Sequence, residues 1–262
     1  MHLRWITLAI LVLLVFGGLI SSVYANAIER DLTLPRAHGQ SGNPPQVLPT
    51  MLPVAPTTTA QGTGQGQADI LAHDTFQRAD QALWGTAVDG HKWQSDANTV
   101  PIFSIMGGMG QIAGAQGTFN AVLGPVSSNT DVVVSTTADR FDAGKVNIGA
   151  VVRWNNTNNW YKALIDGSHF SLIKHVHGVG ATLTSIPFSA QGGVSYTLRV
   201  RAIGTTFLAK VWPTTTSEPP FWMISTTDTS LASGRGGIRI VTQNDTVVHI
   251  CVFLETMVQP TL

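Results

Sequence analysis

The sequence predicts an all-β fold in which two antiparallel sheets pack as a sandwich of jelly-roll type. Three observations support this prediction. Apolar and polar residues alternate along the central stretch of the chain, as they do in strands with one buried face. Many short stretches of this kind follow one another, separated by Gly, Asn and Asp residues that favour turns. No stretch combines the helical period with capping residues.

The central stretch, 147–177, is predicted to form three consecutive antiparallel strands. The buried face of the first strand would carry Ile148, Ala150, Val152 and Trp154. A four-residue loop over 155–158 would then pair Arg153 with Trp160, Val152 with Tyr161 and Ala150 with Ala163. A type I′ turn at Asp166-Gly167 would pair Ile165 with Ser168, Ala163 with Phe170 and Tyr161 with Leu172.

A second hairpin is predicted over 195–212, with its turn at Ile203-Gly204. Its inward face would carry Tyr196, Leu198, Val200, Phe207, Ala209 and Val211. Its outward face would carry Thr197, Arg199, Arg201, Lys210 and Trp212. We predict that one β-sandwich domain spans 68–258, because strand-like stretches follow one another throughout that range. No blade repeat indicates a β-propeller.

The first 25 residues have the pattern of a secretory signal peptide. Arg4 precedes an apolar core over 6–20, and Val23-Tyr24-Ala25 provides a small-residue cleavage site. An uncleaved membrane anchor is the alternative, since 5–23 is nearly long enough to span a bilayer. In either case the rest of the chain is expected outside the cell, secreted or tethered to the surface.

The next segment, 26–67, is predicted to be a linker. It is rich in Pro, Thr, Gly and Gln, a composition that buries too little apolar surface to offset its conformational entropy. The proline-rich part would be semi-rigid and the glycine-rich part flexible. The linker would hold the β domain away from the membrane or wall.

Composition and charge exclude several function classes. The 262 residues include 15 basic and 15 acidic side chains, a formal net charge of zero, and contain no basic run. Nucleic-acid binding is therefore not expected. The single cysteine, Cys251, excludes an intramolecular disulfide and is read as a buried apolar residue. We expect a monomer.

Three patterns that suggest chemistry have simpler interpretations. The stretch 108–113 matches the dinucleotide fingerprint, but a strand rather than a helix follows it. His175 and His177, with His169 in the same phase, are read as exposed strand residues, because zinc needs three or four converging ligands. No pair of Asp or Glu residues can be assigned as the two carboxyl groups of a glycosidase. The residues themselves predict no catalytic residue, metal site or cofactor.

Aromatic residues give the positive functional signal. Indole rings stack on the apolar faces of sugars, while Arg and amide groups bind sugar hydroxyls. Trp160 would lie exposed beside Arg153 and Lys162, near an amide-rich turn, with a surface cation–π pair between Trp160 and Arg153 as the alternative. If both hairpins belong to one sheet, the ligand-binding face would comprise Arg153, Asn158, Asn159, Trp160, Lys162, Arg199 and Trp212, with Arg201 and Lys210 beside them.

Several stretches resemble the concanavalin A-like lectin/glucanase superfamily, over residues 70–257. They are DTFQRADQALWG (74–85), NIGAVVRW and NNWYKALIDG (147–167), SYTLRVRAIGTTFLAKVW (195–212) and GRGGIRI (234–240). The most similar branch is that of laminin-G-like domains of bacterial secreted proteins, which also resemble the 3-keto-disaccharide hydrolase domain. The resemblance implies a jelly roll that binds glycans on a concave sheet, sometimes with calcium.

The resemblance does not imply catalysis. The glucanases of the superfamily use a strand motif E-x-D-x-x-E, and this sequence does not contain it. We therefore expect an exported, non-catalytic binding module for a polysaccharide or cell-envelope glycan. The alternatives are a structural or adhesive surface domain that binds protein, and an unrecognised hydrolase.

Overall fold

The structure is a computed structural model that describes residues 69–259. The predicted signal segment and linker, 1–67, lie outside the described residues. Strands dominate the described part, and its only helical segments are the short 3-10 turns η1 (Asp96–Asn98) and η2 (Asp142–Gly144). The predicted all-β class is confirmed.

The first of the two sheets has nine strands, which we call the nine-stranded sheet. They are β1 (Ile70–Asp74), β2 (Gln81–Ala82), β4 (Phe103–Met106), β5 (Met109–Ala113), β7 (Thr130–Ala138), β12 (Ser195–Ile203), β13 (Thr206–Pro213), β14 (Ile224–Thr227) and β16 (Val247–Met257). Their order is β14-β13-β12-β7-β16-β5-β4-β2, and β1 also pairs with β16.

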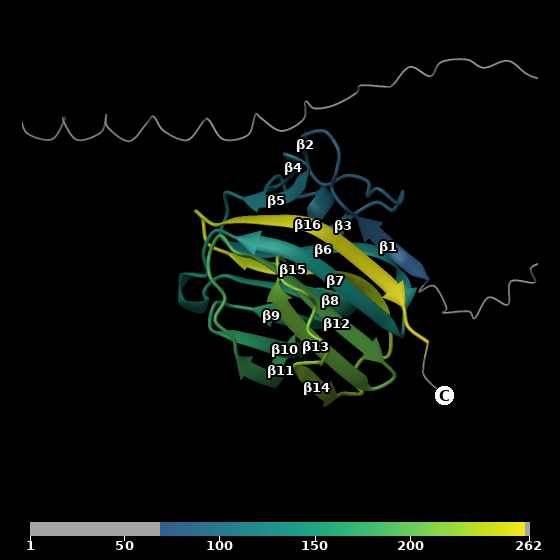
Figure 1. The fold of residues 1–262 in the computed structure, drawn as a ribbon. Coiled ribbons are helices and arrows are strands. Elements are labelled where there is room, and N and C mark those ends of the chain that lie inside the picture. The colour runs from purple at the N-terminus through teal and green to yellow at the C-terminus, as the bar shows by residue number, and fades with distance from the viewer. Residues whose placement is uncertain (1–68, 260–262) are drawn as a thin grey trace, which may run out of the picture. The chain divides into compact units, whose positions relative to one another are not determined.

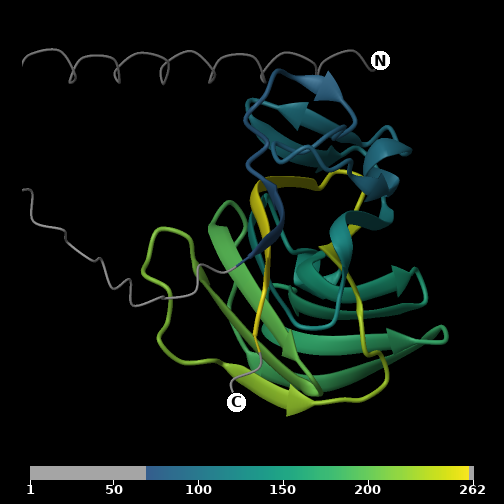
Figure 2. The same cartoon turned by 90° about the vertical axis from the view of Figure 1, so that its right-hand side faces the viewer.

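The second sheet, the seven-stranded sheet, contains the predicted central strands. Its strands are β3 (Gln94–Ser95), β6 (Gly117–Ser127), β8 (Asn147–Asn156), β9 (Asn159–Ile165), β10 (His169–Val176), β11 (Val179–Pro187) and β15 (Gly234–Thr242), in the order β11-β10-β9-β8-β15-β6-β3. All pairs in this sheet are antiparallel. Strands β2, β4 and β5 lie at one end of the domain, and β11 and β14 at the other (Figures 1 and 2).

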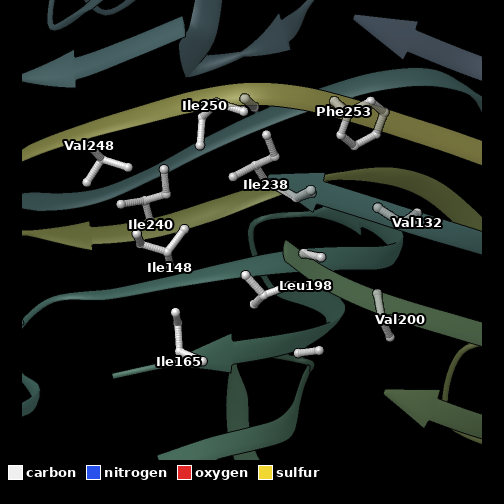
Figure 3. Packing of buried hydrophobic residues seen from close by; sticks show 14 of the residues in the cluster. Val132, Ile148, Ile165, Leu198, Val200, Ile238, Ile240, Val248, Ile250 and Phe253 are labelled. Carbon is white, nitrogen blue, oxygen red and sulfur yellow. The ribbon is translucent and has the colours of Figure 1, made fainter. Parts of the chain in front are cut away.

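The core lies between the two sheets, as the period-two pattern predicts. Branched and aromatic side chains from alternate strand positions meet there, and most are entirely buried. Figure 3 shows ten of them labelled: Val132, Leu198, Val200, Val248, Ile250 and Phe253 from the nine-stranded sheet, and Ile148, Ile165, Ile238 and Ile240 from the seven-stranded sheet.

The segment 74–85 is held by a buried carboxylate. Asp74, with no exposed surface, accepts hydrogen bonds from the Phe76 backbone N–H (2.9 Å), from Arg78 Nη1 (2.8 Å) and from Trp93 Nε1 (2.7 Å). A buried charge needs such partners. The Trp93 ring also packs at 4.8 Å, edge to face, against Trp84. Asp74 therefore ties the start of the domain to its aromatic core.

The predicted pairing of the central strands is right for most of one hairpin and wrong for the next. Val152 pairs with Tyr161, and Ala150 pairs with Ala163, as predicted, but the predicted pair Arg153–Trp160 does not form, because the register shifts after Val152. In the second hairpin Ile165 pairs with Phe170, two residues from the predicted partner. The reason is the turn, where Asp166 Oδ1 accepts hydrogen bonds from the backbone N–H groups of Ser168 (2.9 Å) and His169 (2.8 Å). This widens the loop but keeps every side chain on its face.

A β-bulge in β8 reverses two predicted orientations. Between the pairs Val151–Gly237 and Trp154–Arg235, strand β8 has two residues where β15 has one. Arg153 takes a positive φ of 53° at this bulge. Val152 belongs to the core between the sheets, whereas Val151 and Trp154 belong to a separate apolar cluster. The prediction that Trp154 belongs to the core is therefore wrong.

Gly234 makes the bulge possible. A Cβ at this position would lie 2.3 Å from the Arg153 carbonyl carbon and 2.6 Å from its Cα. No side chain fits there, so only glycine allows the two backbones to approach so closely.

Candidate functional site

The predicted site residues fall on two different sheets. The hairpin β8–β9, with Trp160 and Lys162, belongs to the seven-stranded sheet, and the hairpin β12–β13, with Arg199 and Trp212, belongs to the nine-stranded sheet. The prediction that the two hairpins join one sheet is therefore wrong. Because the two sheets pack face to face, their outer faces point away from each other. The seven predicted residues do not form one surface.

Arg153 does not lie on an outer face. Its side chain is 2% exposed, and its guanidinium stacks on the core residue Phe207 at 5.0 Å. It donates to three carbonyl oxygens, from Nε and Nη2 to Ser128 (3.2 and 2.8 Å), from Nη1 to Leu231 (2.7 Å) and from Nη2 to Gly204 (2.5 Å). Burial lowers its pKa. The bulge turns Arg153 inward, and its role is structural.

Trp160 lies on the outer face of the seven-stranded sheet, but it is only 4% exposed. The His175 ring, from the neighbouring strand β10, stacks on it at 5.1 Å and 10°. Arg239, from β15 on the other side of β9, holds its guanidinium carbon 4.6 Å from the indole centroid. The indole Nε1 donates to the Thr157 carbonyl oxygen (2.9 Å). The predicted exposed indole face is therefore absent, and the cation over the ring is Arg239 rather than Arg153.

Lys162 lies on the same outer face and is 2% exposed. It runs flat over Gly149 of β8, where a Cβ would come within 2.3 Å of its Cε. Its Nζ donates to Asn147 Oδ1 at 2.5 Å. Burial, followed by the nearby charge of Arg239, holds the pKa of Lys162 well below its usual range.

Two arginines on β15 complete this face. Arg239 Nη1 donates to Asn120 Oδ1, and Arg235 Nη1 donates to Gln94 Oε1. Asn120 is itself fixed, because Asp96 Oδ2 accepts its backbone N–H (2.8 Å) and its side-chain amide (3.0 Å). We call Arg235, Arg239 and Lys162 the amide-held cations, since each donates to an amide oxygen. None of the three has an ion pair with a carboxylate within the described residues.

The two β15 arginines are absent from the predicted site residues, although the sequence contains a signal for them. In GRGGIRI, Arg235, Gly237 and Arg239 alternate with core residues at period two. Gly237 and Gly149 both face outward on adjacent strands; Gly149 leaves the space in which Lys162 lies flat, and Gly237 allows close approach of the Ala121 backbone. Alternating Arg and Gly on one strand face is the pattern that indicates this surface.

The predicted amides Asn158 and Asn159 lie at the end of the same face. Asn159 uses its amide within the structure, donating to Asn156 Oδ1 (2.9 Å) and accepting from the His177 N–H (3.0 Å). Asn158 is exposed, and its backbone N–H donates to the same Asn156 oxygen (2.9 Å). Of the two, Asn158 has the side chain that faces solvent.

The outer face of the nine-stranded sheet carries an ion-pair network. Asp131, 2% exposed, bridges Arg199 (2.7 Å to Nη2) and Arg201 (2.8 Å to Nε), and Glu218 bridges Arg199 (2.5 Å) and Lys210 (2.6 Å). The three cations also surround the Trp222 ring, with Lys210 Nζ at 4.7 Å, Arg201 at 5.1 Å and Arg199 at 5.6 Å. Trp212 is 8% exposed beside Lys210. Every charge in this network has a partner of opposite sign.

Glu255 is a carboxyl group between the two sheets. It has no exposed surface, its Oε2 accepts the Gly236 N–H at 3.2 Å, and its Oε1 has no partner. Gly236 and Gly124 leave room for it, since a Cβ on either would lie 2.6 or 3.2 Å from Oε2. Burial raises its pKa to about 8.

The described side chains do not offer a metal site. No group of three or more His, Cys, Asp or Glu residues within 69–259 is arranged to hold an ion. Cys251 is half-buried, and burial raises the pKa of its thiol, which makes it a poor nucleophile.

No known family model matches the chain, and no curated protein does either. Solved structures match it at low identity. A xylan β-1,4-xylosidase from Bacillus halodurans C-125 is 13% identical, with a TM-score of 0.51 over 70% of this chain and 38% of its own. A protein described among endo-acting O-glycanases of the human gut microbiota is 8% identical, with a TM-score of 0.51 over 73% of this chain and 100% of its own.

A third match is the glycoside hydrolase family 43 protein BlXynB from Bacillus licheniformis, 16% identical with a TM-score of 0.50. This chain covers 39% of BlXynB and 38% of the xylosidase, so it spans well under half the length of either enzyme. Within the described range, no helix is both long and apolar enough to cross a bilayer. The described domain is a two-sheet antiparallel sandwich of jelly-roll type, a fold that it shares with these solved structures.

Proposed function

We propose that this protein is an exported, non-catalytic carbohydrate-binding module, and that the glycan lies on the outer face of the seven-stranded sheet. One observation carries the proposal. Trp160 holds a guanidinium from Arg239 and an imidazole from His175 against its ring, at the centre of a face rich in amides. Planar rings contact the apolar faces of sugars, and fixed Arg and amide groups bind their hydroxyls.

Trp160 has a different role here from the one its sequence context suggests. Because the indole is covered, it would position Arg239 and His175 rather than stack on the sugar. The half-buried His175, Arg235 and Arg239, with Gln94 at the edge, are the groups that a ligand can reach. Proteins with this fold are described as acting on xylan or on O-glycans, which is compatible with a carbohydrate ligand.

The carboxyl groups favour binding over hydrolysis. A glycosidase needs a general acid and a second carboxylate on the two sides of the scissile bond. Glu255 has a raised pKa, as a general acid requires, but it lies between the sheets and away from both outer faces. Asp131 and Glu218 lie on an outer face, but arginine and lysine neutralise both. Neither Glu255 nor the pair of Asp131 and Glu218 fits the required arrangement.

A protein partner is the second candidate, and it would use the other sheet. Phe221 is 80% exposed in the loop beside Trp222, next to the ion-pair network. An exposed aromatic residue of this kind often anchors a protein contact. This surface is distinct from the proposed glycan face, so a mutation can separate the two.

The test is binding of the purified protein to a printed glycan array, followed by affinity measurement on any glycan retained. The informative variant is His175→Ala, and His169→Ala is the control, because both histidines lie on β10 and His169 is exposed at its far end. We expect a loss of about fivefold or more for H175A and no change for H169A. Absence of binding to every glycan would overturn the function, and unchanged affinity in H175A would overturn the location.

A further inference from the structure

The amide-held cations differ from the cation cluster on the nine-stranded sheet. On the nine-stranded sheet, Arg199, Arg201 and Lys210 are each bonded to a carboxylate. On the seven-stranded sheet, Lys162, Arg239 and Arg235 donate to the neutral oxygens of Asn147, Asn120 and Gln94. An amide oxygen fixes the direction of a cation but does not neutralise it. Buried charges are normally paired, because an unpaired charge is costly.

The carboxylate of Asp96 does not form an ion pair with Arg239. Its charge favours the charged form of Arg239, but its hydrogen bonds are to Asn120. Lys162 and Arg239 are close enough that the charge of Arg239 disfavours that of Lys162. The outer face therefore holds two arginines and a buried lysine whose charged form is disfavoured, and none of the three has an ion pair with a carboxylate within the described residues. A negative group placed over Arg239 would relieve this repulsion and complete the charge pairing.

We infer that the glycan bound on this face is acidic, with a carboxylate or sulfate group on a sugar ring accepting hydrogen bonds from Arg239 and Arg235. This inference rests on the proposed function and names its ligand class. The two arginines are half-buried and can reach a ligand. Lys162 is buried against Gly149 on the same face, so a ligand does not contact it directly.

Other polyanions fit this surface less well. The face has only three cationic side chains, and the whole chain has a formal net charge of zero. Binding of a nucleic acid relies on a row of cations that follows many phosphates. Here a single anionic group can meet Arg239 directly beside the rings of Trp160 and His175, as a uronate or sulfated sugar would present it.

The experiment uses the full chain and an array on which each uronate-bearing and each sulfated glycan is printed beside its neutral parent. We expect retention of acidic members, at least about tenfold tighter than their parents, and weaker binding as NaCl is raised. Equal binding to acidic and neutral members would overturn the inference and leave the proposed function intact. Retention of nothing would overturn the proposed function itself.

Three charge-removing variants locate the effect. Arg239→Gln and Arg235→Gln each lose about tenfold in affinity for the retained acidic glycan, with little change for its neutral parent. Arg201→Gln, on the opposite outer face, serves as the matched control and stays within about twofold. Thermal unfolding of each variant shows whether R239Q also disturbs Trp160. If it does, R235Q provides the test. Equal loss in R201Q, or no loss in R235Q and R239Q, would overturn the assignment.

Lys162→Met gives a readout that a purely structural lysine would not produce. If the charge is retained for the ligand, K162M weakens binding to the acidic glycan but raises the melting temperature, since it removes an unpaired buried charge. A lower melting temperature together with unchanged binding would contradict this.

Discussion

Lys162 occupies the space that Gly149 leaves on the neighbouring strand. The lysine pairs with Val151 across the β8–β9 hairpin, yet its side chain turns along β8 and reaches Asn147 at 2.5 Å. A Cβ on Gly149 would lie 2.3 Å from Lys162 Cε and 2.6 Å from the Ala163 carbonyl oxygen. The flat position of the lysine thus depends on the missing side chain.

Gly149→Ala is expected to destabilise the domain by about 1–3 kcal/mol, the usual cost of forcing extra atoms into a packed site. Part of the clash is with backbone, which cannot move aside as the lysine can. The measurement is urea unfolding. Gly180→Ala is the control, because its Cβ would meet only His175 Cδ2 at 3.6 Å. Equal stability of G149A and the wild type would contradict the described packing.

Arg153→Met is expected to cost about 2–4 kcal/mol of unfolding free energy. The variant leaves the Ser128, Leu231 and Gly204 carbonyl oxygens without the guanidinium donor, and a hydrogen bond to a charged group contributes about 1.5–3 kcal/mol. Arg235→Met should stay within about 0.5 kcal/mol, since Arg235 lies on the outer face. Chemical denaturation of both variants decides, and similar values for the two would refute the inward orientation of Arg153.

Glu255 should make stability fall as pH rises. Its pKa is about 8 in the folded chain against an ordinary value of 4.5, so the folded state binds the proton more tightly. Stability from this group is complete below about pH 4.5 and is lost as pH rises to about 8, by at most on the order of 5 kcal/mol. Glu255→Gln should flatten that slope in unfolding curves at several pH values. Parallel slopes for E255Q and the wild type would contradict the buried, protonated carboxyl group.

The local strand pattern of this fold could be predicted from sequence, because period-two alternation sets which residues share a face. The β8–β9 pairs Val152–Tyr161 and Ala150–Ala163 followed from the apolar phase and are correct. The β9–β10 pairing could not be fixed in the same way. A shift of two residues keeps all side chains on their faces, so only the Asp166 side chain, which widens the turn, decides the register.

Two features of the candidate site lie beyond local sequence patterns. The bulge at Arg153 depends on a close approach of Gly234, which lies 81 positions later in the sequence. The bulge exchanges the expected directions of the Arg153 and Trp154 side chains. The division of the hairpins between two sheets depends on which strands pair at long range. Alternation along one strand contains neither kind of information.

Trp160→Ala and Val152→Ala should both destabilise the domain, by about 3 and about 2 kcal/mol respectively. Trp160 is 4% exposed and packs with Val151 and Trp154, while Val152 is fully buried in the core. The sequence alone predicts an exposed Trp160 and hence a neutral change. A loss of less than about 0.5 kcal/mol in the unfolding free energy of W160A would contradict the buried position of Trp160.

The central claim is that the outer face of the seven-stranded sheet binds the glycan. Its most direct test is chemical-shift mapping of the labelled protein during titration with the glycan retained on the array. The account predicts shifts of the backbone amides of β8, β9 and β15 and of the Trp160 indole N–H, which donates to Thr157 at 2.9 Å. Shifts confined to β12, β13 and Trp222 would contradict it and place the ligand on the nine-stranded sheet.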